Sequence, residues 1–193
     1  MMASEQNSDR LHKPVSMPPA QSACAGGRSE MSELFCSAMR NFAGACCIIA
    51  TAEGEEYSGL TATAVCSVTA EPPRLLVVVN RNVFAHDVIQ RSAALSVNVL
   101  NDTQRELALR FSGQDDCNPR ERFKDGRWDL VAGRPPRLRN CLASFEGRVT
   151  RTIPESTHTL FLIDIADIRK DEEVRAPLIY FDRKFATLAA SAQ

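Results

Sequence analysis

The chain has 193 residues, of which 44% are hydrophobic and 24% are charged, a composition typical of a globular protein with one core of ordinary size. Because 23 Lys and Arg are balanced by 24 Asp and Glu, no basic surplus is available to neutralise phosphates, and we expect no nucleic-acid partner. No apolar run approaches the roughly 20 residues of a membrane helix, so we expect no membrane partner.

The number and spacing of the seven cysteines indicate their redox state and so the cellular compartment. Their odd number and the lack of a C-x-x-C pair or Cys/His cluster argue against a disulfide framework and against a metal site. No apolar run of signal-peptide length lies near the N-terminus. We therefore expect reduced thiols, several of them buried, in a cytoplasmic protein. The cysteines are Cys24, Cys36, Cys46, Cys47, Cys66, Cys117 and Cys141.

The N-terminal segment, residues 1–31, contains Ser, Gln, Pro, Ala and Gly with almost no large apolar residue. Such a segment cannot offset its ordering entropy by burial, so we predict a disordered tail followed by one domain over residues 32–193. The domain is expected to begin with a helix that Ser32 caps and Gly44 ends. Its apolar residues recur on one helical face, at Leu34, Phe35, Ala38, Met39 and Phe42.

A period of two residues then predicts strands. Residues 45–51 form one strand, a turn follows at residues 52–56, and residues 57–69 form a longer strand or a strand pair. Glu71-Pro72-Pro73 ends this run, because proline cannot donate to a β-ladder. The nearly continuous apolar run at residues 75–80 indicates a strand buried on both faces.

The second half of the chain begins with a predicted helix at residues 85–92 and a strand at residues 95–100. Asp102 is expected to cap a helix that continues through Phe111. Residues 112–140 form a long Arg-rich excursion with Trp128 as its aromatic anchor. Alternation around Phe145 and Ile163 and the run at residues 178–181 predict three more strands. Many strands and few helices indicate a mainly β fold, a closed or nearly closed barrel with peripheral helices.

The most distinctive stretch, from Gly59 to Asn80, reads GLTATAVCSVTAEPPRLLVVVN. Its small side chains would let a flat ligand approach the backbone, whose N–H and C=O groups could bond the edge of a heteroaromatic ring. The alternative is a Thr-rich strand that pairs well and binds nothing. The residues by themselves leave both interpretations open.

The same stretch resembles the flavin reductase family. The pattern Gly-x-Thr-Ala-Thr-Ala-x-x-Ser-Val-Thr-x-x-Pro-Pro, ahead of an apolar strand ending in Asn, is similar to reductase components of two-component aromatic hydroxylases such as hydroxyphenylacetate monooxygenase. The resemblance extends over about residues 33–187. Further motifs follow in order: Val97–Leu100, Phe111-Ser112-Gly113, Arg122-Phe123, Trp128, Pro136, Ala143–Arg148, Thr157-His158 and Leu178–Phe181.

This resemblance implies an FMN-binding split β-barrel that reduces FMN or FAD with NADH or NADPH. It also implies a homodimer, with a separate flavin-dependent monooxygenase as the recipient of the reduced flavin. The implied flavin contacts are Thr61, Ala62, Thr63, Ala64, Val65 and Ser67 for the ring, Asn80, Arg81 and Asn82 toward the ribityl phosphate, and Phe111 near the pocket. The implied nicotinamide contacts are His158, as the catalytic residue, and Tyr180.

The chain departs from the family at two positions. Relatives often have Gly-Asp-His or Gly-Thr-His where this chain has Ser156-Thr157-His158, so the backbone of this loop is a question for the structure. Residues 80–84 lack the Ser/Thr-rich run common in the family, which leaves the phosphate contacts open. His12 lies in the tail. His86, near the start of a predicted helix, is expected to be a solvated surface residue, with a phosphate-side role as the alternative.

Two alternatives to a flavin reductase remain at this point. The Ser-Thr-His variant also resembles FMN-dependent reductases of cob(II)alamin or other corrins. A non-catalytic split-barrel protein that binds flavin or haem is the alternative from another class. Hydrolase chemistry is not expected because no G-x-S-x-G elbow is present. The many arginines of residues 112–140 are diluted by acids, so a solvated lid is expected there rather than a phosphate site.

Overall fold

The computed structural model describes residues 29–113, 121–173 and 175–188. The tail expected over residues 1–31 lies almost wholly outside the described residues. The first half of the chain forms α1 (Glu30–Met39), β1 (Gly44–Ala45), β2 (Cys47–Glu53), β3 (Glu56–Ala62), β4 (Val65–Ala70), β5 (Pro73–Asn80), α2 (Phe84–Ser92) and β6 (Ala94–Val99). The second half forms a 3₁₀ turn (Asp102–Gln104), α3 (Arg105–Phe111), β7 (Trp128–Asp129), β8 (Arg137–Leu138), β9 (Ala143–Glu155), β10 (His158–Lys170), β11 (Leu178–Phe181) and β12 (Lys184–Thr187).

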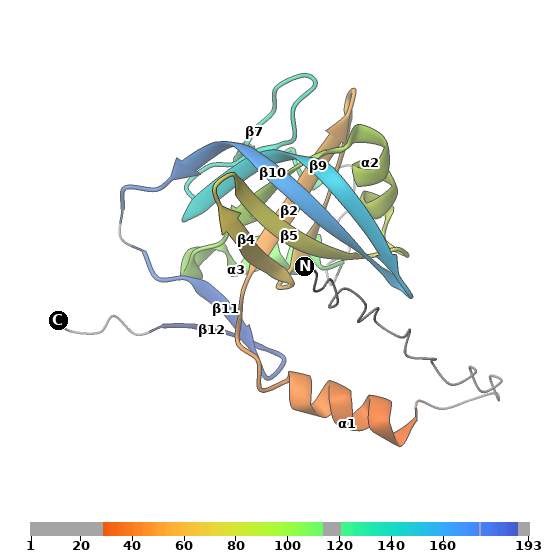
Figure 1. The fold of residues 1–193 in the computed structure, drawn as a ribbon. Coiled ribbons are helices and arrows are strands. Elements are labelled where there is room, and N and C mark those ends of the chain that lie inside the picture. The colour runs from red at the N-terminus through yellow and green to blue at the C-terminus, as the bar shows by residue number, and fades with distance from the viewer. Residues whose placement is uncertain (1–28, 114–120, 174, 189–193) are drawn as a thin grey trace, which may run out of the picture.

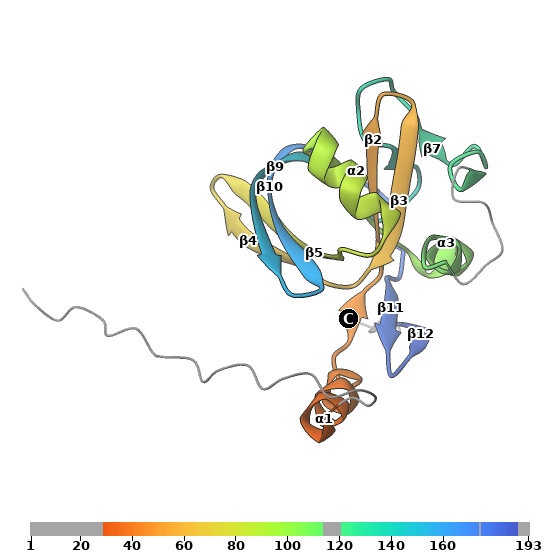
Figure 2. The same ribbon diagram turned by 90° about the vertical axis from the view of Figure 1, so that its right-hand side faces the viewer.

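Seven of these strands form one curved antiparallel sheet in the order β3-β2-β6-β9-β10-β5-β4 (Figure 1). The predicted strand pair at residues 57–69 is confirmed, but its two strands do not pair with each other. Instead β3 and β4 form the two opposite edges of the sheet, and only Thr63 and Ala64 join them. The mainly β fold is therefore confirmed as a barrel that stays split between β3 and β4. Helix α2 lies over one end of the curved sheet (Figure 2).

The core has two parts because β2 is buried on both faces. Cys47 and Ile49 point into the barrel, where they pack with Val77, Phe161 and other apolar residues. The alternate residues of the same strand, Ile48 and Ala50, pack outside the barrel against α3 and the segment after it. The period of two thus places consecutive residues in different clusters. Burial also raises the pKa of Cys46 to about 11 and that of Cys47 to about 12.

Strand β5 differs from the expectation of a strand buried on both faces. Only Val77 and Val79 are buried, and the residues between them are partly exposed. Edge position does not explain this, because β2 also lies one strand from an edge of the sheet. The outer residues of β2 pack under α3 and the segment after it, whereas β5 contributes buried residues only to the cluster inside the barrel. Buried residues run without a break along β2 and β6.

Several predicted helix boundaries are wrong by a few residues. Ser29, not Ser32, caps α1, and the helix ends at Met39 before Gly44, which belongs to β1. Asn101, not Asp102, is the N-cap of the second-half helical segment, where it forms a capping box with Gln104. Strand β12 was not expected at all; it pairs with β11 beside β1 in a separate three-stranded sheet.

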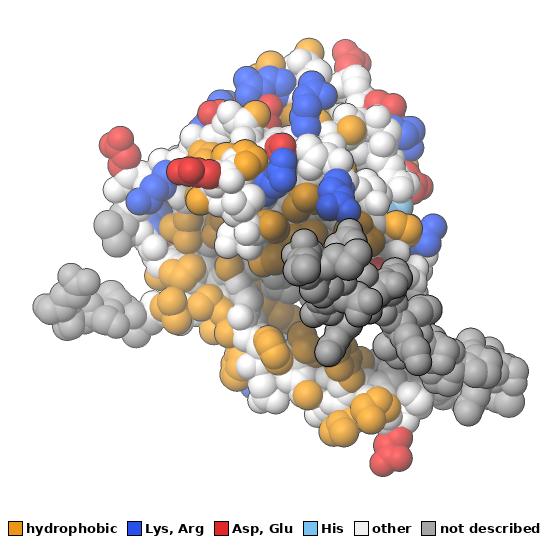
Figure 3. Space-filling model, in the orientation of Figure 1, with side chains coloured by type: hydrophobic (Ala, Val, Ile, Leu, Met, Phe, Trp, Pro, Cys, Tyr) orange, Lys and Arg blue, Asp and Glu red, His pale blue; other side chains and the backbone are white. Residues whose placement is uncertain are grey.

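Helix α1 has the predicted apolar stripe, yet none of its residues is buried. Leu34 and Phe35 are 64% and 62% exposed. The helix lies away from the barrel, beside the β11–β12 hairpin (Figures 1 and 2), and hydrophobic side chains gather on this lower part of the molecule (Figure 3). In the part of the chain described, no helix is both long and apolar enough to cross a membrane.

Candidate functional site

Three links of the chain meet at one end of the barrel. The carbonyl of Ala64 accepts a hydrogen bond from the amide of Val78 at 3.0 Å. Two residues further along β5, Asn80 lies opposite His158 in the β5–β10 register. The amide of Arg81 donates to the carbonyl of Thr157 at 2.9 Å. The structure therefore brings together the predicted flavin residues at 61–65 and 80–82 and the predicted nicotinamide residue His158.

The link between β3 and β4 presents backbone rather than large side chains. Thr63 and Ala64 are exposed, and their amide N–H groups make no hydrogen bond to any of the described residues. The carbonyl of Thr63 accepts from the amide of Val65 at 3.0 Å, and Val65 itself packs against the barrel core. Ser67 is exposed on the edge strand β4. These features agree with a surface that a flat ring can approach closely.

The hydroxyl of Thr61, one of the implied ring contacts, forms a hydrogen bond within the protein. Its Oγ1 donates to the carbonyl of Ala108 at 2.6 Å, which fastens the end of β3 to α3. Ala62 is half-buried beside it and packs on the barrel core. Any ligand contact by Thr61 is therefore left to its backbone.

The side chain of Asn80 stabilises the turn that follows β5. The Oδ1 of Asn80 accepts from the amide of Asn82 at 2.9 Å, an Asx turn that leads into α2. Arg81 and Asn82 are exposed, and the Arg81 Nη1 reaches the carbonyl of Ser156 at 3.5 Å. The two turns of the site are thus held to each other.

His158 is exposed at the first position of β10. Its Nδ1 lies 2.9 Å from the Thr157 hydroxyl, and Nε2 has no hydrogen bond to the described residues. Ser156 adopts a left-handed φ of 49°, the conformation that favours the glycine of many relatives. This answers the question that the sequence raised, because the loop keeps a left-handed residue at this position despite the serine.

Phe111 is buried rather than displayed, with 2% of its surface exposed. Its ring lies 5.1 Å from that of Phe123 and 5.4 Å from that of Trp128. Gly59 allows this packing, because a Cβ there would lie 3.0 Å from the Phe111 ring and 2.8 Å from the carbonyl of Ile49. The predicted anchor Trp128 is confirmed as part of this aromatic cluster.

Tyr180 is not brought to His158 within one chain. It lies on β11 in the three-stranded sheet, where its ring packs 5.4 Å from Phe185. No hydrogen bond or ring contact among the described residues joins Tyr180 to His158. The two predicted nicotinamide residues therefore lie on different sheets.

The expectation of a solvated His86 is wrong. The residue is 3% exposed, its Nε2 lies 2.9 Å from the Thr159 hydroxyl, and its Nδ1 lies 3.1 Å from a carboxylate oxygen of Asp87. Its ring also packs on Phe161 at 5.7 Å. His86 thus ties α2 to the strand that carries His158. No local pattern predicts this contact, because Thr159 is 73 residues away in the chain.

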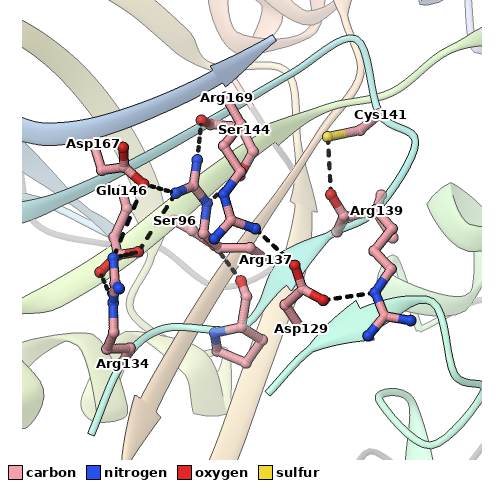
Figure 4. Close-up of polar contacts among 12 residues, drawn as sticks. Ser96, Asp129, Arg134, Arg137, Arg139, Cys141, Ser144, Glu146, Asp167 and Arg169 are labelled. Atoms are coloured by element: carbon pink, nitrogen blue, oxygen red, sulfur yellow. Dashed lines mark hydrogen bonds and ion pairs between the residues drawn. The ribbon is translucent and has the colours of Figure 1, made fainter. Parts of the chain in front are cut away.

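Part of the Arg-rich excursion is packed on the sheet (Figure 4), since residues 135–138 are buried, whereas residues 124–127 and 130–134 are exposed, as expected for a solvated segment. Arg137 is 2% exposed and donates to the carbonyl and hydroxyl of Ser144 and to Asp167. Arg134 forms two hydrogen bonds of 2.8 Å with Glu146, and Arg139 pairs with Asp129. Residues 114–120, where the same expectation also applied, lie outside the described residues.

Comparison with known proteins gives consistent results. Residues 39–189 match the family model for the flavin reductase like domain. The chain is 38% identical over 151 residues to the 4-hydroxyphenylacetate 3-monooxygenase reductase component of Escherichia coli, covering 78% of this chain and 88% of that protein. It is 34% identical over 151 residues to the FMN reductase (NADH) RutF of Pseudomonas syringae, covering 78% and 83%. Among solved structures, the flavin reductase PheA2 superposes with a TM-score of 0.73 at 30% identity, covering 81% and 97%.

Proposed function

The chain belongs to the flavin reductase family, and on that premise we propose that it transfers hydride from NAD(P)H to a flavin and supplies the reduced flavin to a separate monooxygenase. The family match over residues 39–189 carries the proposal, because it includes all the elements that form the site. Of the three relatives described above, one is named a monooxygenase reductase component, one an FMN reductase that uses NADH, and one a flavin reductase. This favours the flavin reductase activity over a corrin reductase or a non-catalytic flavin- or haem-binding protein.

The end of the barrel fits a flavin. Two exposed amides at Thr63 and Ala64 can donate to polar atoms at the ring edge, and the small side chains leave the backbone accessible. The turn at residues 80–82 lies beside this link and suits the ribityl chain. Bound FMN or FAD would supply the hydride acceptor, and the protein would supply orientation.

His158 is the residue we propose to orient the nicotinamide. It is exposed, and Thr157 occupies Nδ1, so Nε2 is free to bond a polar group of the nucleotide. The histidine acts as a positioning contact and need not transfer a proton. Tyr180 joins this proposal through the family resemblance alone.

Among the cofactors left open by the sequence, we propose FMN with NADH. The support is the relative that is 34% identical and named an FMN reductase that uses NADH. We also propose a cytoplasmic location, since Cys46, Cys47, Cys66 and Cys141 are free thiols and reduced thiols suit a reducing compartment.

A homodimer is proposed from an exposed apolar stripe formed by α1 and by Phe42, which follows the helix. Met31, Leu34, Phe35, Met39 and Phe42 are each at least 43% exposed, and Phe181 of the neighbouring hairpin is 44% exposed. Apolar side chains gathered in this way mark a protein interface more often than a solvated face. A second copy packed against this stripe would remove the apolar side chains of α1 and of the hairpin from water in both subunits.

The test is an anaerobic assay that crosses NADH and NADPH with FMN, FAD and riboflavin. We expect rapid nucleotide oxidation that depends on added flavin, and fastest oxidation with NADH and FMN. Oxidation no faster than the uncatalysed reaction for every pair would refute the proposed function. An added arm with cob(II)alamin supports a corrin reductase instead if cobalt reduction outpaces that by free reduced flavin.

A further inference from the structure

His86 is a buried side chain directly beneath the candidate site. It lies in the first turn of α2 and is 3% exposed. Its Nε2 lies 2.9 Å from the hydroxyl of Thr159, which is 1% exposed, and its ring packs on Phe161. Thr159 follows His158 in β10, and successive side chains of a strand point to opposite faces. The contact therefore holds, from inside the barrel, the end of the strand that presents His158 to solvent.

Both ring nitrogens of His86 have a partner, and these partners fix the direction of each hydrogen bond. The carboxylate of Asp87 lies 3.1 Å from Nδ1, and a carboxylate can only accept. Nδ1 therefore carries the hydrogen, Nε2 accepts, and the Thr159 hydroxyl donates. The two bonds hold the imidazole in one tautomer and one orientation, as a positioning group requires.

His86 links two elements that otherwise make little contact. Helix α2 packs on β2, β3 and β6 and lies over one end of the curved sheet (Figure 2). Among the described residues, no other side-chain hydrogen bond joins this helix to β10. At the surface, the amide of Arg81 donates to the carbonyl of Thr157 at 2.9 Å. The turn before α2 and the turn before β10 are thus joined at the surface, and His86 and Thr159 join the two elements again inside the barrel.

The last residue of α2 makes a comparable contact that does not adjoin the site. Thr51 of β2 is also 1% exposed. Its Oγ1 donates to the carbonyl of Ala94 at 2.7 Å and lies 2.9 Å from the hydroxyl of Ser92. A serine is therefore long enough to meet a buried threonine at this end, whereas the first turn uses the longer imidazole of His86 to reach β10. The two ends of α2 provide a matched pair of buried threonine contacts.

We propose that His86 is a positioning residue for hydride transfer, which acts through Thr159 on the orientation of His158. This inference rests on the proposed function. With the contact in place, β10 begins in one backbone position, and the His158 imidazole meets the nucleotide in one geometry. Without it, the strand keeps its partners Asn80 and Glu155 but loses its support from inside the barrel. A small displacement of an orienting group is enough to slow the reaction.

The first experiment compares Thr159→Val with the matched control Thr51→Val. Each change replaces a buried hydroxyl by a methyl group, so we expect both to lower the midpoint of urea denaturation to a similar extent. For Thr159→Val we expect kcat/KM for NADH to fall about 10-fold, as the loss of one hydrogen bond predicts, with an unchanged dissociation constant for FMN. Thr51→Val should keep the wild-type kcat/KM, and Thr159→Ser, which retains the hydroxyl, should recover most of it. Equal kcat/KM values for the two valine variants would overturn the inference.

A second experiment separates positioning from stability. His86→Leu leaves the Thr159 hydroxyl buried without a partner, whereas the double variant His86→Leu/Thr159→Val removes both polar groups. We expect the double variant to be more stable than His86→Leu but to keep the lowered kcat/KM; a kcat/KM that returned with the stability would mean that His86 only stabilises the fold. In a His158→Ala background, Thr159→Val should not lower kcat/KM further. A further fall of about 10-fold there would show that Thr159 does not act through His158.

Hydrogen exchange of the full-length proteins tests the same contact without turnover. The peptide that covers residues 155–160 should exchange faster in Thr159→Val than in the wild type and in Thr51→Val, because local opening of the strand end becomes easier. Equal exchange in the three proteins would overturn the inference. A wild type that oxidises no nucleotide would refute the proposed function, and the exchange rates would still decide whether His86 holds this end of β10.

Discussion

At the outer face of β9 and β10, Arg134, Arg137 and Arg139 are each held by an acid. By contrast, the amide of Thr63, the Nε2 of His158 and the Nε of Arg122 have no hydrogen-bond partner among the described residues. Both regions are rich in polar side chains, and composition does not distinguish them. The two regions differ in whether their polar groups have hydrogen-bond partners within the protein. A region in which donors and acceptors are paired stabilises the fold, whereas a region with unpaired polar groups can bind a ligand.

The largest effect is expected at Arg137. Arg137→Ala removes the donors that hold β8 to Ser144 and Asp167, so we expect a loss of about 3 kcal/mol in the free energy of unfolding. Urea denaturation measures this. FMN affinity of the folded protein is expected to stay unchanged, because the arginine lies outside the barrel end. A stable variant with weakened FMN binding would reverse the roles of the two regions.

His158→Ala is expected to have the opposite profile. The free energy of unfolding should change by less than about 0.5 kcal/mol, since the side chain is exposed. Losing one positioning contact commonly costs roughly 10- to 1,000-fold in kcat/KM for NADH, while the dissociation constant for FMN should hold. Anaerobic stopped-flow reduction of the flavin separates the two quantities. Wild-type reduction rates would show that His158 is an ordinary strand-edge histidine.

Ala64→Leu tests the access to the backbone between β3 and β4. A larger side chain beside the two free amides should weaken FMN binding about 10-fold, or about 1.4 kcal/mol, while the barrel still folds because residue 64 is exposed. Ala70→Leu, at an exposed position at the far end of β4, is the matched control. Equal quenching titrations for both variants and the wild type would mean that this link is structural only.

The smallest expected effect is on the pH dependence of the free energy of unfolding. The Arg137 guanidinium lowers the pKa of Asp167, chiefly by a hydrogen bond, so the carboxylate adds stability above the usual Asp pKa of about 4. That contribution is lost as the pH falls through the lowered pKa. Because Asp167 is partly exposed, the effect is modest. Denaturation of Arg137→Ala from pH 6 to pH 3 should therefore show a smaller loss of stability than the wild type; parallel curves would contradict the pairing.

The sequence by itself determined the mainly β fold and the family. Apolar runs and period-two alternation are local signals, so β2, β6, β9 and β10 could be predicted from their own residues. The motif from Gly59 to Pro73 and the Thr157-His158 pair indicated the barrel end, and the structure places them together. The αL serine at position 156 could be suspected only because relatives often have glycine there.

Tertiary structure alone decided which polar residues are satisfied. His86 looked like a surface residue, yet Thr159 and Phe161 bury it. Arg122 and Arg137 are both arginines of one Arg-rich segment, but Asp167 and Ser144 reach only the second. Thr63 and Ala64 join strands at opposite edges of the sheet, a fact that depends on pairing between distant segments. Satisfaction of a hydrogen bond is a property of two partners in space, and one of them is usually far away in the sequence.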